Sequence, residues 1–379
     1  MIHIIPTDKF TSNILCLLIR RPLLRAEVTK TALLPALLQR ACARYPTIRD
    51  MRLAVESLQG GIFDAQIVKK GEQQILQFFL ECVDCGEEPI NFLQEVVFNP
   101  RFDEASVKGE VENLKNRIEG RINNKGDYVK LKCLEFMCQD EPFGIYGDGY
   151  VEDLPHIENL HEHYNNILAE SPMELIAFGR WDKAHLPKLD KKAELPKPKI
   201  LPARSQRQVI QLDHGSAQGN LCIGLRADIP SVGMDFIHFQ LANEILGGGP
   251  NSKLFANIRE KESLCYSIYS TIFRFKSIMC ILAGTEPDKL ERVMELCEAE
   301  IHNLKRGEFD LDGAKLSLSK RWRVMQDRPS ACVDFYASQY LLGDPYSLDE
   351  LLLQVKEATH EGVVSVASRL NIDTVVMMR

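Results

Sequence analysis

The sequence predicts an α+β protein made of two homologous domains, each a mainly antiparallel sheet flanked by helices. The same order of elements occurs twice along the 379 residues: two strands, helices, two strands, helices and a final strand. A period close to half the chain indicates a duplicated domain, since solenoid repeats recur every 20–50 residues or so. A proline-rich linker separates the two copies.

The linker covers residues 186–205 and holds four prolines among five lysines. Charged, proline-rich segments of this kind act as semi-rigid spacers. We therefore expect a first domain over residues 1–185 and a second domain over residues 206–379.

Hydrophobic alternation and helical periodicity define the elements within each domain. In the first domain strands are expected at 2–5, 13–20, 61–70, 73–83 and 174–178, and helices at 28–43, 47–58, 88–98, 103–123, 127–138 and 155–169. In the second, strands are expected at 208–213, 220–227, 266–275, 277–283 and 374–378, and helices at 234–246, 253–262, 287–305, 310–326, 329–342, 347–358 and 360–370.

Composition narrows the function classes. The net charge is −7, which argues against a nucleic-acid-binding protein, because such proteins present a basic face. The early apolar run 14–19 is much shorter than the roughly 20 residues of a membrane span. Arg20 and Arg21 follow this run, whereas the charges of a signal peptide precede its apolar core. The chain is therefore expected to be cytoplasmic, with no membrane span.

The eleven cysteines show no disulfide framework, so we interpret them as reduced structural thiols. Cys82 and Cys85 form a single CxxC pair at the end of a strand, without the second pair of a typical zinc site. Cys133 and Cys138 are five residues apart on an expected helix. An enzyme that uses Cys82 and Cys85 remains a minor alternative.

The segment from Gly247 to Tyr266 reads GGGPNSKLFANIREKESLCY and carries the most specific pattern in the chain. Its glycines and proline end one helix, and Asn251 and Ser252 are expected to cap the next. Arg259 lies on that helix, and Tyr266 follows seven residues later where a strand should begin. Two donors so placed can point at one carbonyl oxygen and stabilise an oxyanion. The structural alternative is an exposed helix arginine and an ordinary strand tyrosine.

This segment resembles the second-domain signature of the pitrilysin and insulinase-type zinc metallopeptidases, which include mitochondrial processing peptidase. Three other stretches fit that family in the expected order: Leu58–Ala65 (LQGGIFDA), Ser171–Asp182 (SPMELIAFGRWD) and Leu282–Pro287 (LAGTEP). The resemblance covers nearly the whole chain. It implies that the two domains form a half-clamshell, and that a paralogous subunit or a second copy supplies the other half.

The catalytic motif of that family, His-x-x-Glu-His, is absent. In active members the two histidines bind zinc from one helix face and the glutamate activates water. The corresponding helix reads TALLPALLQRACARYP, with Leu34, Leu37 and Leu38 near the motif positions and Pro35 expected to disturb the helix. Residues 28–55 contain neither histidine nor glutamate. We therefore expect no metal and no catalytic residue in this chain.

Other possible ligands do not replace the motif. Glu110 and Glu112 lie near the place of the distal zinc ligand, but without histidines we interpret them as solvent-facing helix residues. His156, His161 and His163 cluster in sequence. His161 and His163 point about 200° apart on a helix, which favours a surface helix over a zinc site.

The resemblance assigns roles to the remaining signature residues. In the family, an arginine and a tyrosine at this spacing bind the substrate backbone at the active site of the other domain. Arg259 and Tyr266 are thus expected to contact a peptide in trans, together with Gly247, Gly248 and Gly249, since a glycine-rich run at this place helps the non-catalytic subunit of mitochondrial processing peptidase to recognise substrate. Zinc and His-x-x-Glu-His would belong to a paralogous catalytic partner.

The favoured function is therefore a non-catalytic, substrate-binding subunit of a two-component zinc peptidase that cleaves or matures peptides, inactive when alone. Extended peptides can pair with an exposed sheet edge, and residues 63–69 are a candidate exosite of this type. The alternative is a structural or peptide-binding scaffold without proteolytic activity, like the core subunits of respiratory complexes that share the fold.

Overall fold

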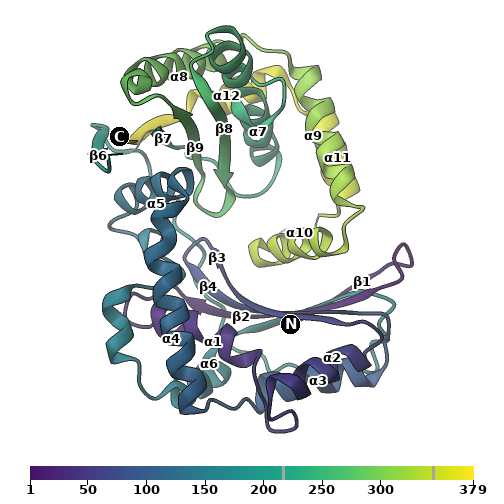
Figure 1. The fold of residues 1–379 in the computed structure, drawn as a ribbon. Coiled ribbons are helices and arrows are strands. Elements are labelled where there is room, and N and C mark those ends of the chain that lie inside the picture. The colour runs from purple at the N-terminus through teal and green to yellow at the C-terminus, as the bar shows by residue number, and fades with distance from the viewer. Residues whose placement is uncertain (216–217, 344–345) are drawn as a thin grey trace. The chain divides into compact units, whose positions relative to one another are not determined.

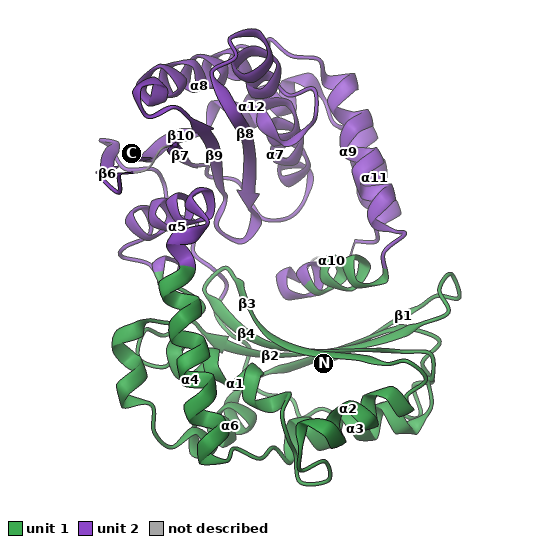
Figure 2. Ribbon diagram, in the orientation of Figure 1, with its two compact units in different colours: residues 1–120, 145–196, 329–337 green, residues 121–144, 197–328, 338–379 purple. Residues whose placement is uncertain are grey.

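Two five-stranded sheets, each covered by helices, make up the protein (Figure 1). The computed structural model describes residues 1–215, 218–343 and 346–379. The chain divides into two compact units (Figure 2). The first holds residues 1–120, 145–196 and 329–337, and the second holds 121–144, 197–328 and 338–379. The boundaries expected from the sequence separate the strands of the two sheets. The compact units differ from them in two segments: residues 121–144, from the first half of the chain, belong to the second unit, and residues 329–337, from the second half, belong to the first unit.

The first sheet has the strand order β1-β5-β2-β4-β3. Its strands are β1 (Ile2–Pro6), β2 (Asn13–Pro22), β3 (Ile62–Lys70), β4 (Gln73–Cys82) and β5 (Met173–Gly179). β1 runs parallel to β5, and the other neighbours are antiparallel. Polar turns separate long apolar strands here, and β3 and β1 are left as the two edges of the sheet.

Five α-helices belong to the first unit: α1 (Val28–Leu38), α2 (Ile48–Ser57), α3 (Glu87–Phe98), α4 (Glu104–Glu119) and α6 (Leu160–Glu170). Figure 1 shows α1, α2, α3 and α6 on one face of the sheet. The core between sheet and helices includes Leu17, Phe78 and Leu175 from the strands and Leu34 and Val96 from the helices. Burial of these apolar side chains is the main stabilising term for the unit.

The second sheet repeats the first, with the strand order β6-β10-β7-β9-β8. Its strands are β6 (Gln208–Leu212), β7 (Gly219–Arg226), β8 (Cys265–Phe273), β9 (Ile278–Thr285) and β10 (Asn371–Met378). β6 runs parallel to β10, and the other pairs are antiparallel. Each strand occupies the place of its counterpart in the first sheet, so the predicted fold class, a duplicated α+β domain with mainly antiparallel sheets, is confirmed.

The helices of the second unit cover both faces of its sheet. They are α5 (Lys125–Met137), α7 (Met234–Asn243), α8 (Leu290–Lys305), α9 (Leu311–Met325), α11 (Leu348–Glu357) and α12 (His360–Ser368). α5 packs on one face, where Cys133 and Met137 meet Cys222, Cys280 and Val376. α10 (Pro329–Leu342) begins in the first unit and ends in the second.

The segment 186–205, all of which is described, contains neither helix nor strand but is anchored at several points. In the first unit Glu194 forms an ion pair with Arg20, with 3.2 Å between Oε2 and Nη1. In the second unit the backbone N–H of Arg204 donates to Asp373 Oδ2 at 3.0 Å. None of the helices in the described part of the chain combines the length and apolarity that a membrane crossing requires.

Candidate functional site

The helix in place of the expected zinc motif belongs to the hydrophobic core. The side chains of Leu34, Leu37 and Leu38 on α1 are at most 1% exposed and pack in the core of the first unit. Pro35 lies inside this helix, which nevertheless continues to Leu38, and the Pro35 carbonyl accepts from the backbone N–H of Gln39 at 3.3 Å. The expected disturbance is therefore limited to the amide hydrogen bond that proline cannot donate.

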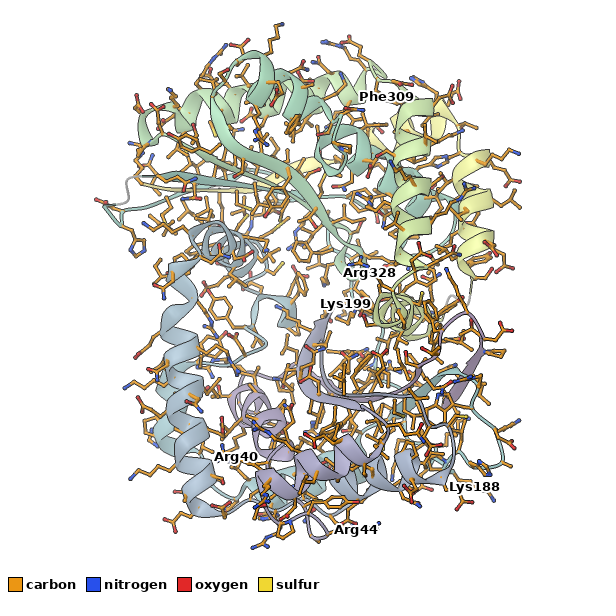
Figure 3. All side chains as sticks on the ribbon, turned by 45° about the vertical axis from the view of Figure 1, so that its right-hand side comes forward. Arg40, Arg44, Lys188, Lys199, Phe309 and Arg328 are labelled. Carbon is orange, nitrogen blue, oxygen red and sulfur yellow. The ribbon has the colours of Figure 1, made fainter. Side chains whose placement is uncertain are left out.

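Glu110, near the place of the distal zinc ligand, is ion-paired and largely buried, so the expectation of a solvent-facing side chain was wrong. Its Oε1 lies 2.6 Å from Nη1 of Arg40, which is labelled in Figure 3, and its side chain is 11% exposed. Its Oε2 accepts from Asn113 at 3.1 Å. Glu112 is exposed, as expected. The Glu110 carboxylate is therefore neutralised by an arginine of the same unit.

The histidines of residues 156–163 have separate surroundings. His161 is exposed and stacks on Phe102, with ring centroids 4.6 Å apart. Nε2 of His163 lies 2.9 Å from the Thr31 hydroxyl, and burial lowers the pKa of this histidine. Over the described ranges, no group of three or more histidine, cysteine or acidic side chains is arranged to hold a metal ion.

The CxxC pair lacks the features of a reactive thiol site. The Cys82 thiol donates to the Asp84 carbonyl at 3.1 Å, and burial raises its pKa to about 12. A thiol with so high a pKa carries almost no thiolate near neutral pH, and the thiolate is the nucleophilic and metal-binding form. None of the eleven cysteines, all of which the structure describes, forms a disulfide.

Arg259 and Tyr266 both lie on irregular backbone in the second unit. Arg259 belongs to a π-helical segment, Phe255–Lys261, that ends shortly before Ser263 in left-handed conformation (φ 54°). Tyr266 follows at the start of β8. It occupies a β-bulge, because Cys265 pairs with Thr285 while Ser267 already pairs with Gly284. π-helical turns and β-bulges are frequent at functional sites, where they redirect a side chain.

Both side chains reach solvent. Arg259 is exposed, and its guanidinium carbon lies 4.8 Å from the centroid of the Phe255 ring. Tyr266 is 61% exposed. Neither side chain forms a hydrogen bond or ion pair with the described part of the chain. The backbone beneath them is held firmly, since Asn257 donates to Glu300 at 2.7 Å and the Thr285 hydroxyl donates to the Leu264 carbonyl.

The three glycines before this segment are closely packed, and backbone atoms confine Gly247 most tightly. A Cβ on Gly247 would lie 2.6 Å from the backbone nitrogen of Ser270, one on Gly248 would lie 2.5 Å from Asn243 Nδ2, and one on Gly249 would lie 2.7 Å from Glu244 Oε1. Real Cβ contacts are essentially never so short, so a side chain at Gly247 would displace backbone, whereas one at Gly248 or Gly249 would first displace the side chain of Asn243 or Glu244. Packing thus accounts for Gly247, and contact of the run with substrate stays a prediction.

The cap expected from Ser252 does not form. The Ser252 side chain is 2% exposed, and its hydroxyl has no hydrogen-bond partner among the described residues. The sequence pattern correctly marks Ser252 as the residue before the helix, but it gives no sign of the cavity that this residue lines. Nor does any motif mark Lys253 and Asp310, which line the same cavity.

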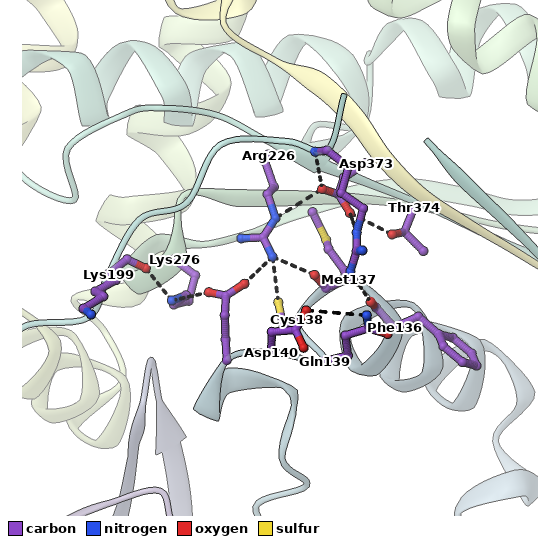
Figure 4. Close-up of polar contacts among 12 residues, drawn as sticks. Phe136, Met137, Cys138, Gln139, Asp140, Lys199, Arg226, Lys276, Asp373 and Thr374 are labelled. Atoms are coloured by element: carbon purple, nitrogen blue, oxygen red, sulfur yellow. Dashed lines mark hydrogen bonds and ion pairs between the residues drawn. The ribbon is translucent and has the colours of Figure 1, made fainter. Parts of the chain in front are cut away.

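A second concentration of charge in this unit is closed to solvent (Figure 4). The guanidinium of Arg226 contacts both Glu141 and Asp373, and the Lys276 ammonium lies 2.7 Å from Glu141 Oε2. Lys276 also donates to the Lys199 carbonyl. Burial alone would raise the pKa of Glu141, but the hydrogen bonds from Lys276 and Arg226 lower it overall. These charges neutralise one another, so we assign them a structural role.

Comparison with known proteins agrees with this geometry. The family model described as "Peptidase M16 inactive domain" matches residues 156–318. "Probable inactive metalloprotease YmfF" of Bacillus subtilis is 26% identical, and the alignment covers all of this chain and 95% of that protein. An "uncharacterized zinc protease" of Rickettsia felis is 23% identical over 78% of this chain and 74% of its own length.

Solved structures share the fold over the whole chain. A conserved protein from Enterococcus faecalis V583 superposes with a TM-score of 0.90 at 24% identity, covering 100% of this chain and 96% of that one. The peptidase M16 inactive domain from Pseudomonas fluorescens gives a TM-score of 0.84 at 20% identity, with 100% and 95% covered. The chain is thus similar over residues 156–318 to the inactive domain of peptidase M16 and over its whole length to a protein named an inactive metalloprotease, and leucines occupy the helix where the zinc motif was expected.

Proposed function

We propose that the protein is the non-catalytic, substrate-binding subunit of a two-component zinc peptidase. A paralogous partner would carry His-x-x-Glu-His and the zinc ion, and the substrate would be a peptide. One observation carries the proposal: Arg259 and Tyr266 are exposed on irregular, well-anchored backbone in a chain whose zinc position has become core.

The chemistry of the pair supports a role in trans. A guanidinium and a phenol are both hydrogen-bond donors at neutral pH. Donors directed at a peptide carbonyl become more favourable as negative charge develops on that oxygen during attack by water. A purely structural role gives no reason to keep a π-helical turn and a bulge beneath two solvent-exposed donors.

Sheet edges offer a way to hold the rest of the peptide. β8 is the edge strand of its sheet and begins at Cys265, next to Tyr266, while β3 with residues 63–69 is an edge of the first sheet. An extended peptide can add to such an edge through backbone hydrogen bonds with little demand on sequence. A cytoplasmic location would suit eleven cysteines without a disulfide, because thiols stay reduced in that compartment.

The test uses the complex with a paralogue that contains His-x-x-Glu-His, assembled by co-expression and checked by light scattering. Arg259→Ala and Tyr266→Phe should each lower the cleavage rate of a peptide by about 10²–10³-fold without disturbing assembly. The exposed residues Arg292 and Tyr346 provide matched controls, as Arg292→Ala and Tyr346→Phe, which should cleave at the wild-type rate.

The alternative function is a scaffold without proteolytic activity. The packing around Gly247 favours this alternative, because it explains that glycine without any contact to a substrate. If no such paralogue forms a complex with the chain, or if both site variants cleave within about twofold of wild type, the peptidase-subunit proposal fails. The scaffold function would then be the better explanation of the fold.

A further inference from the structure

A cavity of about 210 Å³ opens in the second unit beside the glycine run. It lies between the loop that carries Gly249 and Ser252 and the beginning of α9. The polar and aromatic side chains that line it are Glu244, Asn251, Ser252, Lys253, Phe309, Asp310 and Ser317. Neither Arg259 nor Tyr266 lines the cavity, and Gly249 is the one residue that it shares with the predicted substrate-binding set.

The bottom of the cavity is electrically balanced. Glu244 is only 3% exposed, and its carboxylate accepts from the Ser317 hydroxyl at 2.6 Å. Its other oxygen lies 2.6 Å from the Arg321 guanidinium. A buried carboxylate that is both hydrogen-bonded and ion-paired is stable in its charged form. The charge of Glu244 is therefore already compensated and does not by itself demand a cation in the cavity.

Ser252 provides the independent sign of a ligand. Its residue surface is 2% exposed, it lines the cavity, and its hydroxyl has no hydrogen-bond partner in the part of the chain described here. Proteins leave few buried polar groups unsatisfied, because each one loses its hydrogen bonds to water without replacement. A group that enters the cavity and exchanges a hydrogen bond with Ser252 would remove this cost.

Charges of opposite sign stand at the wall of the cavity. The Lys253 ammonium is 3.7 Å from its nearest carboxylate oxygen, on Glu300, which is a long ion pair. Asp310 is exposed and caps α9 by accepting from the Gly313 N–H at 3.1 Å. A carboxylate has about four acceptor sites, so this cap leaves Asp310 able to accept further donors.

An aromatic wall completes the cavity. Phe309, labelled in Figure 3 beside the start of α9, stacks on His360 with centroids 4.4 Å apart and an interplanar angle of 24°. This stacking orients the ring that lines the cavity. The volume of about 210 Å³ is below the roughly 300–1,000 Å³ of sites for drug-sized ligands. The ligand must therefore be small.

We infer that this cavity binds a free α-amino acid. The ammonium group of the ligand would pair with Asp310, and its carboxylate would accept from the Lys253 ammonium and the Ser252 hydroxyl. Its side chain would lie against Phe309. A zwitterion uses the charges of both signs, whereas an anion would face Asp310 and Glu244 and a simple cation would face Lys253. The inference does not depend on the proposed peptidase partnership.

The binding test uses the purified full chain and each standard L-amino acid at millimolar concentration. We expect at least one to raise the melting temperature and to give a saturable signal in isothermal titration calorimetry. The methyl ester of that amino acid, which lacks the carboxylate, and its N-acetyl derivative, which lacks the ammonium, should each bind at least about tenfold more weakly.

Variants then locate the site. Asp310→Asn retains a good N-cap residue, so the fold should persist while affinity falls about 10–100-fold, and Lys253→Gln should act similarly. Asp103→Asn, at the N-cap of α4 where Asp103 accepts from Ser106, and Lys289→Gln on the surface are matched controls that should bind normally. Ser252→Ala should weaken binding without lowering the stability of the ligand-free chain.

Three outcomes would overturn the inference. The first is that no amino acid changes the melting temperature or gives a titration signal. The second is that the methyl ester binds as tightly as the parent amino acid, which would indicate a cation site. The third is that Asp310→Asn and Lys253→Gln both retain wild-type affinity, which would place any binding elsewhere. Because the assay needs no catalytic partner, its failure is separate from a failure of the peptidase-subunit proposal.

Discussion

Replacement of Glu141 by glutamine tests how the segment 121–144 is attached to the second unit. In the folded protein the Glu141 carboxylate accepts from both Arg226 and Lys276, and the Lys276 side chain is fully buried. Glu141→Gln keeps the size of the side chain but removes its charge. Arg226 would then keep the carboxylate of Asp373 at 3.4 Å, whereas Lys276 would lose the carboxylate that lies 2.7 Å from its ammonium.

The expected loss follows from that geometry. Removal of one partner from a buried ion pair costs about 3–5 kcal/mol, because a charge stays buried without its compensation. We expect the lower end, about 3 kcal/mol, since Asp373 still offsets Arg226 and the glutamine oxygen still accepts one hydrogen bond. Glu141→Met combined with Lys276→Met should recover most of this loss, because apolar residues of similar volume replace buried ion pairs at little cost.

The assay is urea unfolding followed by circular dichroism and by tryptophan fluorescence. Each unit contains one tryptophan, Trp181 in the first and Trp322 in the second, so a Trp322→Phe background reports the first unit alone. The urea midpoint of the second unit's unfolding transition should fall by about 1 M or more, given a dependence of the unfolding free energy on urea of about 1–3 kcal/mol/M. Glu308→Gln, in an exposed pair with Arg306, is the matched control and should leave the midpoint unchanged.

The pH dependence gives a second criterion. The pKa of Glu141 is lowered below its usual 4.5 in the folded chain, so its stabilisation is present above that value and is lost as pH falls through the lowered pKa. Wild type and Glu141→Gln should therefore converge in stability on acidification. A loss below about 1 kcal/mol at neutral pH, or a difference between the two that is constant down to acidic pH, would refute the electrostatic reasoning.

Three further predictions use simpler measurements. Elemental analysis of the purified chain should find no stoichiometric zinc, and a tightly bound zinc ion would contradict the account of the leucine-filled position. Gly247→Ala should destabilise the protein by about 1–3 kcal/mol because its Cβ would meet the Ser270 backbone, whereas Gly109→Ala, on an open face of α4, should not destabilise it. Burial lowers the pKa of His238, so the stability of the folded chain should fall as pH drops below about 6.5, the pKa of histidine in an unfolded chain. His238→Gln should reduce the slope of melting temperature against pH, whereas His156→Gln, at an exposed histidine, should leave it unchanged.

The sequence was sufficient for the fold because each strand and helix follows its own local pattern. In β2 (Asn13–Pro22) successive side chains point to opposite faces of the sheet, and all but the last are buried. α11 (Leu348–Glu357) begins with a capping box formed by Ser347 and Glu350. Internal duplication then set the order of strands, since the second sheet repeats the first. The exchange of residues 121–144 could not be inferred, because it depends on Arg226 and Lys276, which lie far from Glu141 in sequence.

The candidate site was only partly accessible to sequence reasoning. Spacing placed Arg259 on a helix and Tyr266 at a strand start, but neither the π-helical turn nor the β-bulge has a distinct residue pattern. The expected solvent-facing Glu110 proved to be buried because Arg40, 70 residues away, neutralises it. The cavity at Ser252 was missed for the same reason, since Asp310 and Phe309 reach it from a distant part of the chain.

The zinc position and the arginine–tyrosine segment have different surroundings, and the difference bears on function. Buried Leu34 and Leu38 contribute apolar area to a core, so their presence is explained by stability alone. Arg259 and Tyr266 bury little surface and bond to none of the described residues, so stability does not explain them. We propose that these exposed donors act on a partner or substrate outside the chain. The contrast between the two sites is what supports that proposal over a purely structural fold.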